Sequence, residues 1–337
     1  MQRRNNMLSK KVLHSFYQAL LGFEEDDLWN AVLAHAEIKN PWFTHENATK
    51  VLQQWRASLE EAKIASFMES YAFPDHTSAK TLGLIMAGNI PAVGMHDVLM
   101  GLACGYTIKG KLSSLDEDIP KYWLKKAIEN FPELEGRVDW VDKLNGVDFV
   151  VVTGSDSTAR TFEYYFRETP KVVRKNRNSL AVLKGNESKE EMIALGEDIF
   201  AYFGLGCRSV THLKVPKGYD FKPLIESWDG YHDNIHHNKY ANNYHYHKAL
   251  LLLDLDPHID FGYGILHESE KLYSPVGTIH YSFYDSPEEV DLFIADHSAD
   301  IQCVVGQDYL PLGTAQKTEL RDFADNVDTV KALLQNA

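Results

Sequence analysis

The chain has 337 residues, and 44% of them are hydrophobic, which is enough for two domains with buried cores. Its formal net charge of −14 argues against nucleic acid or an anionic membrane as the main partner. Three cysteines are too few for a disulfide framework, so a reducing, cytoplasmic setting is expected. No membrane-spanning helix and no signal peptide are expected from the apolar pattern.

The first part of the chain is predicted to be helical, because residues 8–72 place apolar side chains at three- and four-residue spacing. From about residue 80 to 166, apolar strands alternate with amphipathic helices. This alternation predicts an α/β domain with a doubly wound parallel sheet.

A second α/β lobe is predicted to begin near residue 171. Ser188 and Glu191 have the spacing of a capping box ahead of a helix that ends at Gly204. Strands are expected at 179–185, 247–254, 277–283 and 300–306.

Cys207 is the candidate nucleophile. It follows a predicted helix and two glycines, Gly204 and Gly206, which leave room for a substrate carbon to approach the sulfur. Arg208 beside it favours the thiolate, which is the reactive form. The same residues also fit a structural cysteine, and that is how Cys104 and Cys303 are interpreted.

The turn GNIPAV at residues 88–93 follows the first predicted strand and places Asn89 at the carboxyl edge of the sheet, where ligands bind in such folds. Its amide could donate a hydrogen bond to an oxyanion. Alternatively, it satisfies the backbone of the turn.

Two further stretches could hold a cofactor. VVVTGSDSTAR at 150–160 predicts a strand, a turn and a helix whose free N–H groups suit a pyrophosphate, although an ordinary strand–helix turn has the same pattern. Lys109 and Lys111 alternate onto one face of a strand, near hydroxyls, and could hold a ribose phosphate. An exposed strand end is the alternative there.

Residues 232–248 contain five of the 15 histidines. They lack the HExxH order and carboxylates at helical spacing, so no metal is expected. A polar, aromatic wall of an active site, or an interface loop, is the favoured interpretation.

Taken in order, these motifs resemble the aldehyde dehydrogenase superfamily, and most closely its LuxC-type acyl-CoA reductases. The resemblance runs from about residue 80 to the C-terminus. It rests on GNIPAV, KGKLSSLD, VVTGS, the Gly-Cys step after a helix, NKYANNYHYHKALLLLD, YSPVGTIHY and GTAQKTELRDFADNVDTV.

The resemblance implies roles for individual residues. Cys207 matches the catalytic thiol of the family, and Asn89 matches the asparagine that binds the developing oxyanion. The remaining matches concern the cofactor: Lys111 at the adenosine ribose, with Ser113 and Ser114 in the same stretch, Gly154 and Ser155 beside the pyrophosphate, and Glu270 at the nicotinamide ribose.

Two departures from the family bear on the reaction. The stretch KVVRKNRNSL lacks the glutamate that activates water in typical members, and such a base is needed for hydrolysis but not for acyl transfer to or from coenzyme A. Ser114 stands where many NAD-preferring members have a glutamate, which favours NADPH because no carboxylate repels its 2′-phosphate.

The resemblance therefore implies NADPH-dependent reduction of a fatty acyl-CoA to the aldehyde through a Cys207 acyl-enzyme. It also implies a homo-oligomer. The expected organisation is a helical region at 1–72, an NADP-binding domain at 73–175 and 300–337, and a catalytic domain at 176–299, with Cys207 in the cleft between the two domains. The alternatives are a reductase of an acyl-carrier-protein or other activated acyl donor, a non-catalytic subunit with this fold, and a histidine-based metalloenzyme.

Overall fold

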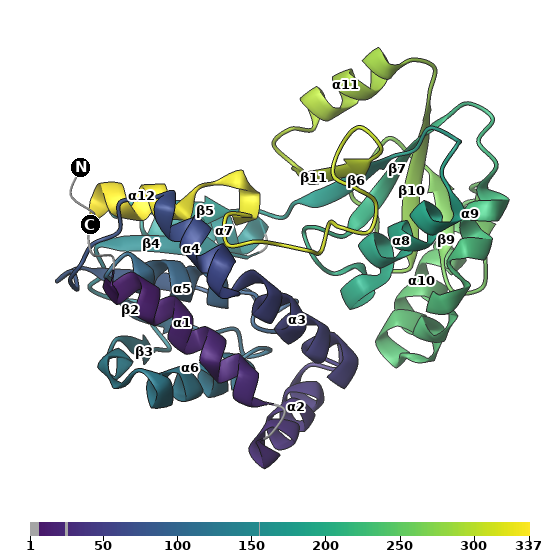
Figure 1. The fold of residues 1–337 in the computed structure, drawn as a ribbon. Helices are drawn as coiled ribbons and strands as arrows, with labels where there is room; N and C mark the ends of the chain where they lie inside the picture. The colour runs from purple at the N-terminus through teal and green to yellow at the C-terminus, as the bar shows by residue number, and fades with distance from the viewer. Residues whose placement is uncertain (1–6, 24–25, 155) are drawn as a thin grey trace. The chain divides into compact units, whose positions relative to one another are not determined.

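The protein was examined as a computed structural model, which describes residues 7–23, 26–154 and 156–337 (Figure 1). The chain divides into two compact units. Unit 1 comprises Met1–Asn176 and Thr318–Ala337, and unit 2 comprises Arg177–Lys317.

Unit 1 begins with helices, as predicted for residues 8–72. They are Met7–Gly22 (α1), Asp27–Lys39 (α2), His45–Ser58 (α3) and Glu61–Glu69 (α4). α1 buries Val12, Leu13 and Phe16 completely and packs against two later helices of the unit, Met95–Ala103 (α5) and Asp118–Asn130 (α6). The helical region is thus part of unit 1, because its apolar face is covered by that unit.

The sheet of unit 1 is parallel throughout, with the strand order β3-β2-β1-β4-β5. Its strands are Thr81–Ile85 (β1), Thr107–Lys111 (β2), Val138–Trp140 (β3), Phe149–Thr153 (β4) and Lys171–Arg174 (β5). The other elements are Pro132–Leu134 (η2), Asp156–Tyr165 (α7), Ala324–Asn326 (η5) and Thr329–Asn336 (α12). This order confirms the predicted doubly wound sheet. The chain adds β2 and β3 on one side of β1 and then β4 and β5 on its other side, so the order of the strands reverses between β1 and β4.

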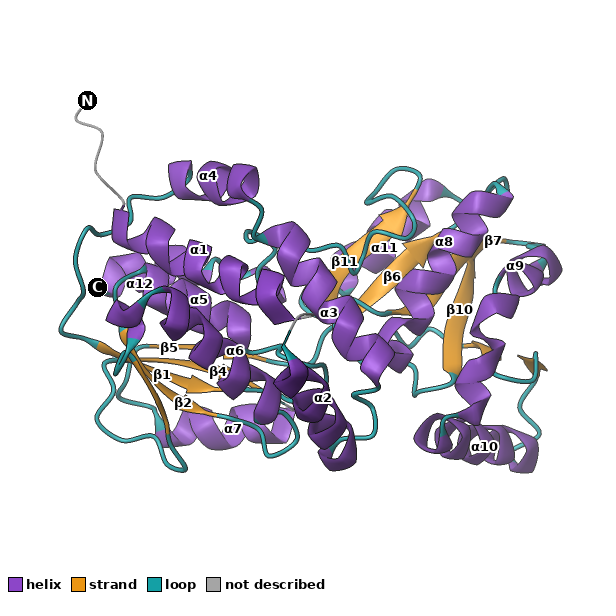
Figure 2. Cartoon of the chain, turned by 60° about the horizontal axis from the view of Figure 1, so that its bottom comes forward, coloured by secondary structure: helices purple, strands orange, loops and turns teal. Residues whose placement is uncertain are grey.

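Both faces of this sheet are covered, as period-two alternation requires. Leu82 and Leu84 of β1 belong to the core that includes α5, whereas Ile85 points into the core that includes residues of α7. Figure 2 shows α5 and α7 on opposite faces of the sheet.

Unit 2 contains a six-stranded sheet with the order β11-β6-β7-β10-β9-β8, in which only β8 is antiparallel to its neighbour. The strands are Asn178–Val182 (β6), Val210–Pro216 (β7), His258–Asp260 (β8), Ile265–Glu268 (β9), Thr278–Tyr284 (β10) and Ile301–Gly306 (β11). The helices are Lys189–Phe200 (α8), Ala201–Gly204 (η3), Phe221–Ser227 (α9), Asp229–His236 (η4), Asn238–Leu253 (α10) and Pro287–Asp296 (α11).

One domain boundary predicted from the sequence is wrong. Residues 301–306 were expected to return to the cofactor domain, but β11 pairs in parallel with β6 in unit 2. The chain returns to unit 1 only from Thr318. There α12 buries Val330 and Leu333, and the Thr329 hydroxyl accepts a hydrogen bond of 2.6 Å from Arg174.

A second element was also predicted wrongly. Residues 247–254 were expected to form a strand, but they continue α10 to Leu253. Their leucines are not the core of a sheet, because Leu252 and Leu253 are exposed. Among the helices in the described part of the chain, none is both long and apolar enough to cross a membrane.

Candidate active site

Cys207 lies in a turn of unit 2, between the end of α8 and the start of β7, and its side chain is partly exposed. α8 begins with the predicted capping box, in which Ser188 and Glu191 bond each other's backbone N–H groups. Beyond α8, Tyr202, Phe203 and Gly204 all adopt left-handed backbone conformations, with φ of 53°, 57° and 74°.

This left-handed segment is costly for non-glycine residues, by about 1–2 kcal/mol each. Aromatic packing holds it in place: the Phe203 ring stacks on the His237 ring at a centroid distance of 4.4 Å, and Tyr202 is buried. Strained backbone that the surrounding structure maintains is common beside functional groups. Here it sets the direction in which the chain enters the Cys207 turn.

Hydrogen bonds from buried hydroxyls fix the backbone of the turn. The Ser179 hydroxyl, at the start of β6, donates to the Cys207 carbonyl at 3.1 Å. The Ser209 hydroxyl accepts the Gly206 N–H, also at 3.1 Å. Both serines are fully buried, so these bonds are shielded from water.

A loop near the end of unit 2 also supports the turn. The buried Asp198 carboxylate, on α8, accepts the N–H groups of Gly313 at 2.6 Å and Ala315 at 2.8 Å. Burial raises the pKa of Asp198 to about 6. The Arg208 guanidinium donates a hydrogen bond to the Ala315 carbonyl of this loop. This arginine was expected to favour the Cys207 thiolate, but here it binds a backbone oxygen.

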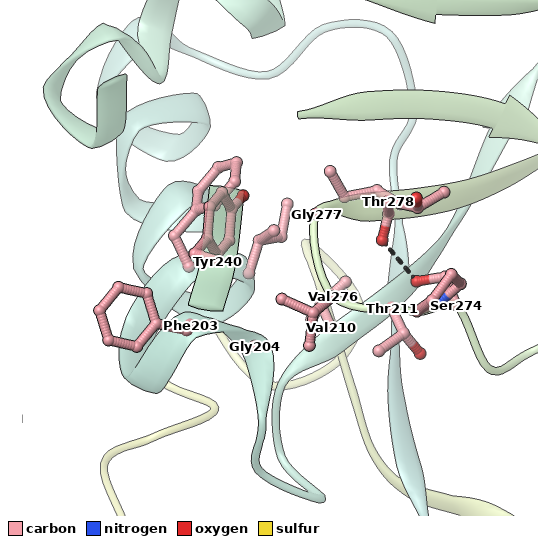
Figure 3. Close-up of a pocket in the computed structure, with 13 residues that line it drawn as sticks. Phe203, Gly204, Val210, Thr211, Tyr240, Ser274, Val276, Gly277 and Thr278 are labelled. Carbon is pink, nitrogen blue, oxygen red and sulfur yellow. Dashed lines mark hydrogen bonds between the residues drawn. The ribbon is translucent and has the colours of Figure 1, made fainter. Parts of the chain in front are cut away.

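A small hollow of about 20 Å³, with room for about one water molecule, lies beside the same segment (Figure 3). Its wall includes Gly204 and Val210, which flank the Cys207 turn in the sequence, and the rings of Phe203 and Tyr240. Ser274 to Ile279 complete the lining, and the Ser274 hydroxyl donates to the Thr278 carbonyl at 2.7 Å. The lining residues are mostly apolar or aromatic, but the space among them is too small for a hydrocarbon chain in this structure.

Glu270, the predicted nicotinamide-ribose contact, precedes this lining segment. Its exposed carboxylate accepts the ammonium group of the buried Lys214 at 3.2 Å. The next carbonyl, that of Lys271, accepts hydrogen bonds from the Nδ1 atoms of His212 at 3.0 Å and His280 at 2.9 Å. Burial lowers the pKa of His212 to about 3, so this histidine is uncharged near neutral pH. The segment after Glu270 is therefore held firmly against β7 and β10.

The histidine-rich segment forms η4 and the first half of α10. His237 caps α10 by accepting the Tyr240 N–H at 3.3 Å. His232, Asp233 and His236 come within 4.8 Å of one another, but all three are exposed. The part of this segment that contacts the chain before Cys207 is aromatic, because Phe203 packs against the rings of His237 and Tyr240.

Unit 1 contributes a second set of candidate residues, at the carboxyl edge of its sheet. Because β1, β2 and β4 are adjacent and parallel, the turns that follow them lie at the same edge. These turns carry Asn89, Ser113 with Ser114, and Gly154. The edge also contains the β1–β4 reversal of strand order, which is where such sheets bind ligands.

The turn with Asn89 is fixed mainly through its backbone. The Asn40 amide donates to the Gly88 carbonyl at 3.2 Å, and a Cβ on Gly88 would lie only 2.5 Å from the Ser113 hydroxyl. Ala92 is buried with a left-handed φ of 54°. Asn89 itself is exposed. The β1 and β2 turns therefore touch, with Asn89 at their surface.

The lysines of β2 lie on one face, as predicted, and both reach the loop before β4. Lys109 donates to the Asn145 carbonyl at 2.9 Å, and Lys111 donates to the Asp142 carbonyl at 2.8 Å. Asp116, which sequence reasoning overlooked, is buried, and burial raises its pKa well above the usual value. It therefore adds little negative charge to this edge.

Gly154 follows β4, and a Cβ there would lie 2.8 Å from the Thr158 side chain, so the turn into α7 is tight. Ser155, the other predicted pyrophosphate contact, lies outside the described residues. Tight turns that open a helix expose backbone N–H groups, which suit phosphate. Lys111 ends β2 at the same edge of the sheet, with β1 between it and β4.

The remaining cysteines differ from Cys207. Cys104 is fully buried, and burial raises the pKa of its thiol, as expected for a core residue. Cys303 is only partly buried, and its Sγ lies 3.1 Å from the Ser179 hydroxyl that also binds the Cys207 carbonyl. Sequence reasoning missed Ser179 and Asp198, because each lies far along the chain from its hydrogen-bond partner.

No protein-family model matches the sequence, and no curated protein matches it. Solved structures share its fold. KauB, an aldehyde dehydrogenase from Pseudomonas aeruginosa, is 14% identical with a TM-score of 0.61, covering 90% of this chain and 72% of that chain. An NAD⁺ complex of aldehyde dehydrogenase from Bacillus cereus is also 14% identical, with a TM-score of 0.59, covering 89% of this chain and 72% of that chain.

A mutant of propionaldehyde dehydrogenase from the Clostridium phytofermentans fucose utilisation bacterial microcompartment is 9% identical, with a TM-score of 0.59, covering 94% of this chain and 83% of that chain. At such low identities, the likeness shows the fold alone. This chain has the α/β fold of aldehyde dehydrogenases, with two sheets.

Proposed function

We propose that this chain reduces an acyl-CoA thioester to the aldehyde, with Cys207 as the nucleophile and NADPH as the reductant. The observation that carries the proposal is the Cys207 turn: a partly exposed thiol on a backbone fixed by buried hydroxyls and preceded by a left-handed segment. Such pre-organisation is typical of residues that react.

In the proposed reaction, the Cys207 thiolate attacks the thioester carbonyl carbon and forms a carbon–sulfur bond. The tetrahedral oxyanion accepts hydrogen bonds from the Asn89 amide and the Cys207 N–H. Its collapse breaks the bond to coenzyme A, which leaves as a thiolate. A bound nicotinamide coenzyme supplies the hydride for reduction. The Cys207 thiolate is regenerated when the aldehyde is released.

The absence of a water-activating base supports acyl transfer over aldehyde oxidation. Residues 171–183, which comprise β5, β6 and the residues between and after them, contain neither aspartate nor glutamate. On β6 the buried polar residue is Ser179, a weak base that donates to the Cys207 carbonyl. An acyl-enzyme on Cys207 would therefore hydrolyse slowly and persist until it is reduced.

The preference for NADPH is supported by the carboxyl edge of the unit 1 sheet. Lys111, Ser113 and Ser114 would hold the adenosine ribose, and the turn at Gly154 would face the pyrophosphate. Ser114 is exposed and uncharged, and the nearby carboxyl of Asp116 is buried, so a 2′-phosphate would meet little repulsion. Ser114→Glu should shift the ratio of kcat/KM from NADPH toward NADH by ~10-fold, and Ser114→Ala should not.

Coenzyme A is proposed as the acyl carrier because the motifs of this chain resemble those of the acyl-CoA reductases. A steady-state assay should compare acyl-CoA, acyl-carrier-protein and acyl phosphate donors of equal chain length. We expect the highest kcat/KM with acyl-CoA. A higher value with another donor would keep Cys207 as the nucleophile and replace coenzyme A as the carrier.

The cellular setting belongs to the same proposal. A reducing, cytoplasmic compartment would keep Cys207 in its thiol form. An assembly of identical subunits is also proposed.

A further inference from the structure

We infer that His232, Asp233 and His236 form a binding site for a divalent transition-metal ion such as Zn²⁺. The three residues lie on η4, and each offers one ligand atom within 4.8 Å of the other two. The sequence gave no expectation of a metal, because the HExxH order is missing, but the fold groups three ligands at a different spacing. The ion would be an accessory one, bound at the surface of unit 2 and separate from the proposed chemistry of Cys207.

The distances within the group are close to those around a bound ion. The Asp233 Oδ1 atom lies 4.0 Å from His232 Nδ1 and 3.8 Å from His236 Nε2, and the two imidazole rings have centroids 6.2 Å apart. Two atoms that each bind a tetrahedral zinc ion at about 2.0–2.2 Å are roughly 3.4 Å from one another. Small rotations of the side chains would therefore bring all three atoms to one ion.

The three side chains can make these rotations. Their exposed fractions are 55% for His232, 93% for Asp233 and 74% for His236. Within the described part of the chain, no hydrogen bond joins any of these side chains to a residue outside the group. His232 also meets the Tyr263 ring at a centroid distance of 5.5 Å, which limits how far it can swing away.

The charge and the donor atoms both favour a transition-metal ion. Residues 223–238 contain three carboxylates, those of Glu226, Asp229 and Asp233, and neither lysine nor arginine, so the local charge attracts a cation. Two imidazole nitrogens with one carboxylate oxygen suit zinc and its first-row neighbours, whereas Ca²⁺ and Mg²⁺ require mostly oxygen ligands. Three protein ligands would leave one tetrahedral position to water.

η4 lies between two aromatic contacts with the segment that precedes Cys207. Before the group, the Tyr231 ring stacks on Phe200 at a centroid distance of 4.9 Å. After the group, the His237 ring stacks on Phe203 at 4.4 Å. An ion that cross-links the turn between these two contacts would hold both rings in place. We therefore expect the ion to stabilise unit 2, because it binds a group of ligands that only the folded chain assembles.

The test is isothermal titration calorimetry of the full chain, free of any polyhistidine tag, with Zn²⁺. We expect one ion to bind at this group, and we expect His232→Ala and His236→Ala each to raise the dissociation constant by ~10-fold or more. The matched control is His245→Ala, an exposed histidine on α10 outside the group, which should bind Zn²⁺ like the original chain. All three variants should keep the circular dichroism spectrum, since the substituted side chains are exposed.

A second titration separates this group from the thiol, because a cysteine thiolate also binds zinc. Cys207→Ala should still bind the ion, and Zn²⁺ should raise its unfolding temperature by a few degrees. The double variant Cys207→Ala, His236→Ala should show no such increase. A chain that binds no Zn²⁺, or equal binding by the original chain and His236→Ala, would overturn the inference. Loss of binding in Cys207→Ala would place the ion at the thiol and would overturn it equally.

Discussion

The two candidate loops of this chain are held in different ways. The Cys207 turn of unit 2 is fixed by buried polar side chains: Ser179, Ser209 and Asp198 each bind backbone groups of the turn or of its supporting loop. The Asn89 turn of unit 1 has one such bond, from the buried Asn40 amide to the Gly88 carbonyl, and is otherwise fixed by close packing, in which Gly88 lies against Ser113.

This difference predicts different sensitivities. A turn held by buried hydrogen bonds should respond to the loss of a polar group and to pH, because an unpaired or ionised buried group is costly. A turn held by close packing should respond to added volume, because a well-packed site tolerates little extra bulk. Substitutions in each unit can separate the two cases.

The largest effect is expected at the thiol itself. Cys207→Ala removes the sulfur that is proposed to form the acyl-enzyme, so reductase activity should fall by at least ~10⁴-fold while the cofactor still binds. The measurement is steady-state reduction of acyl-CoA, with cofactor binding followed by fluorescence. Cys303→Ala is the matched control and should keep most of the activity. Near-normal turnover by Cys207→Ala would refute the assignment.

The next effect is expected at Asn89. Removing one oxyanion donor typically costs ~10²–10³ in kcat, so Asn89→Ala should lower kcat by that factor. The KM for acyl-CoA should change little, because the hydrogen bond forms in the transition state. Since Asn89 is exposed, its loss should leave the unfolding temperature unchanged. A kcat within threefold of the original value would remove Asn89 from the mechanism.

The support for the Cys207 turn should depend on pH through Asp198. Its pKa is raised to about 6, above the ordinary value of 3.8, so between pH 4 and 6 the folded state keeps a proton that the unfolded state has lost. The free energy of unfolding should therefore fall as the pH rises through this window, by up to about 3 kcal/mol, and level off above pH 6.

Asp198→Asn isolates this effect, because the variant cannot titrate at this position. Urea unfolding of both proteins at several pH values gives the difference between their free energies of unfolding. That difference should change between pH 4 and 6 and stay constant above pH 6. Parallel profiles across the whole range would show that Asp198 has an ordinary pKa.

The smallest effect is expected from added volume in unit 1. Gly88→Ala would place a methyl group 2.5 Å from the Ser113 hydroxyl and 2.6 Å from its Cβ, so the Asn89 turn must shift. We expect kcat/KM to fall by ~10-fold. Gly22→Ala is the control, because no atom lies within 4 Å of the added methyl group. Equal activity of the two variants would show that the turn accommodates the methyl group.

Much of the fold followed from local pattern. The alternation of strands and helices between residues 80 and 166 predicted the parallel sheet, because buried parallel strands are apolar throughout. The point at which the chain returns to unit 1 could not be predicted in this way. β11 is as apolar as any other strand, and only its pairing with β6 places it in unit 2. The leucines at 250–253 were wrongly predicted to form a strand for a related reason, since an exposed apolar helix end and a buried strand have equally apolar sequences.

The candidate site was predictable where residues are close in sequence. Gly204, Gly206 and Cys207 stand together, and so do Gly88 and Asn89. Ser179 and Asp198 could not be found in this way. Ser179 lies 28 residues before Cys207, and Asp198 lies 115 residues before Gly313, so only the fold brings each to its partner.

The central claim is that the Cys207 sulfur accepts the acyl group. Intact mass spectrometry after mixing the protein with acyl-CoA, in the absence of NADPH, tests it most directly. The account predicts a mass increase of one acyl group, located on Cys207 by peptide mapping and lost when NADPH is added. An unmodified protein, or an acyl group on Cys303 with Cys207 free, would contradict it.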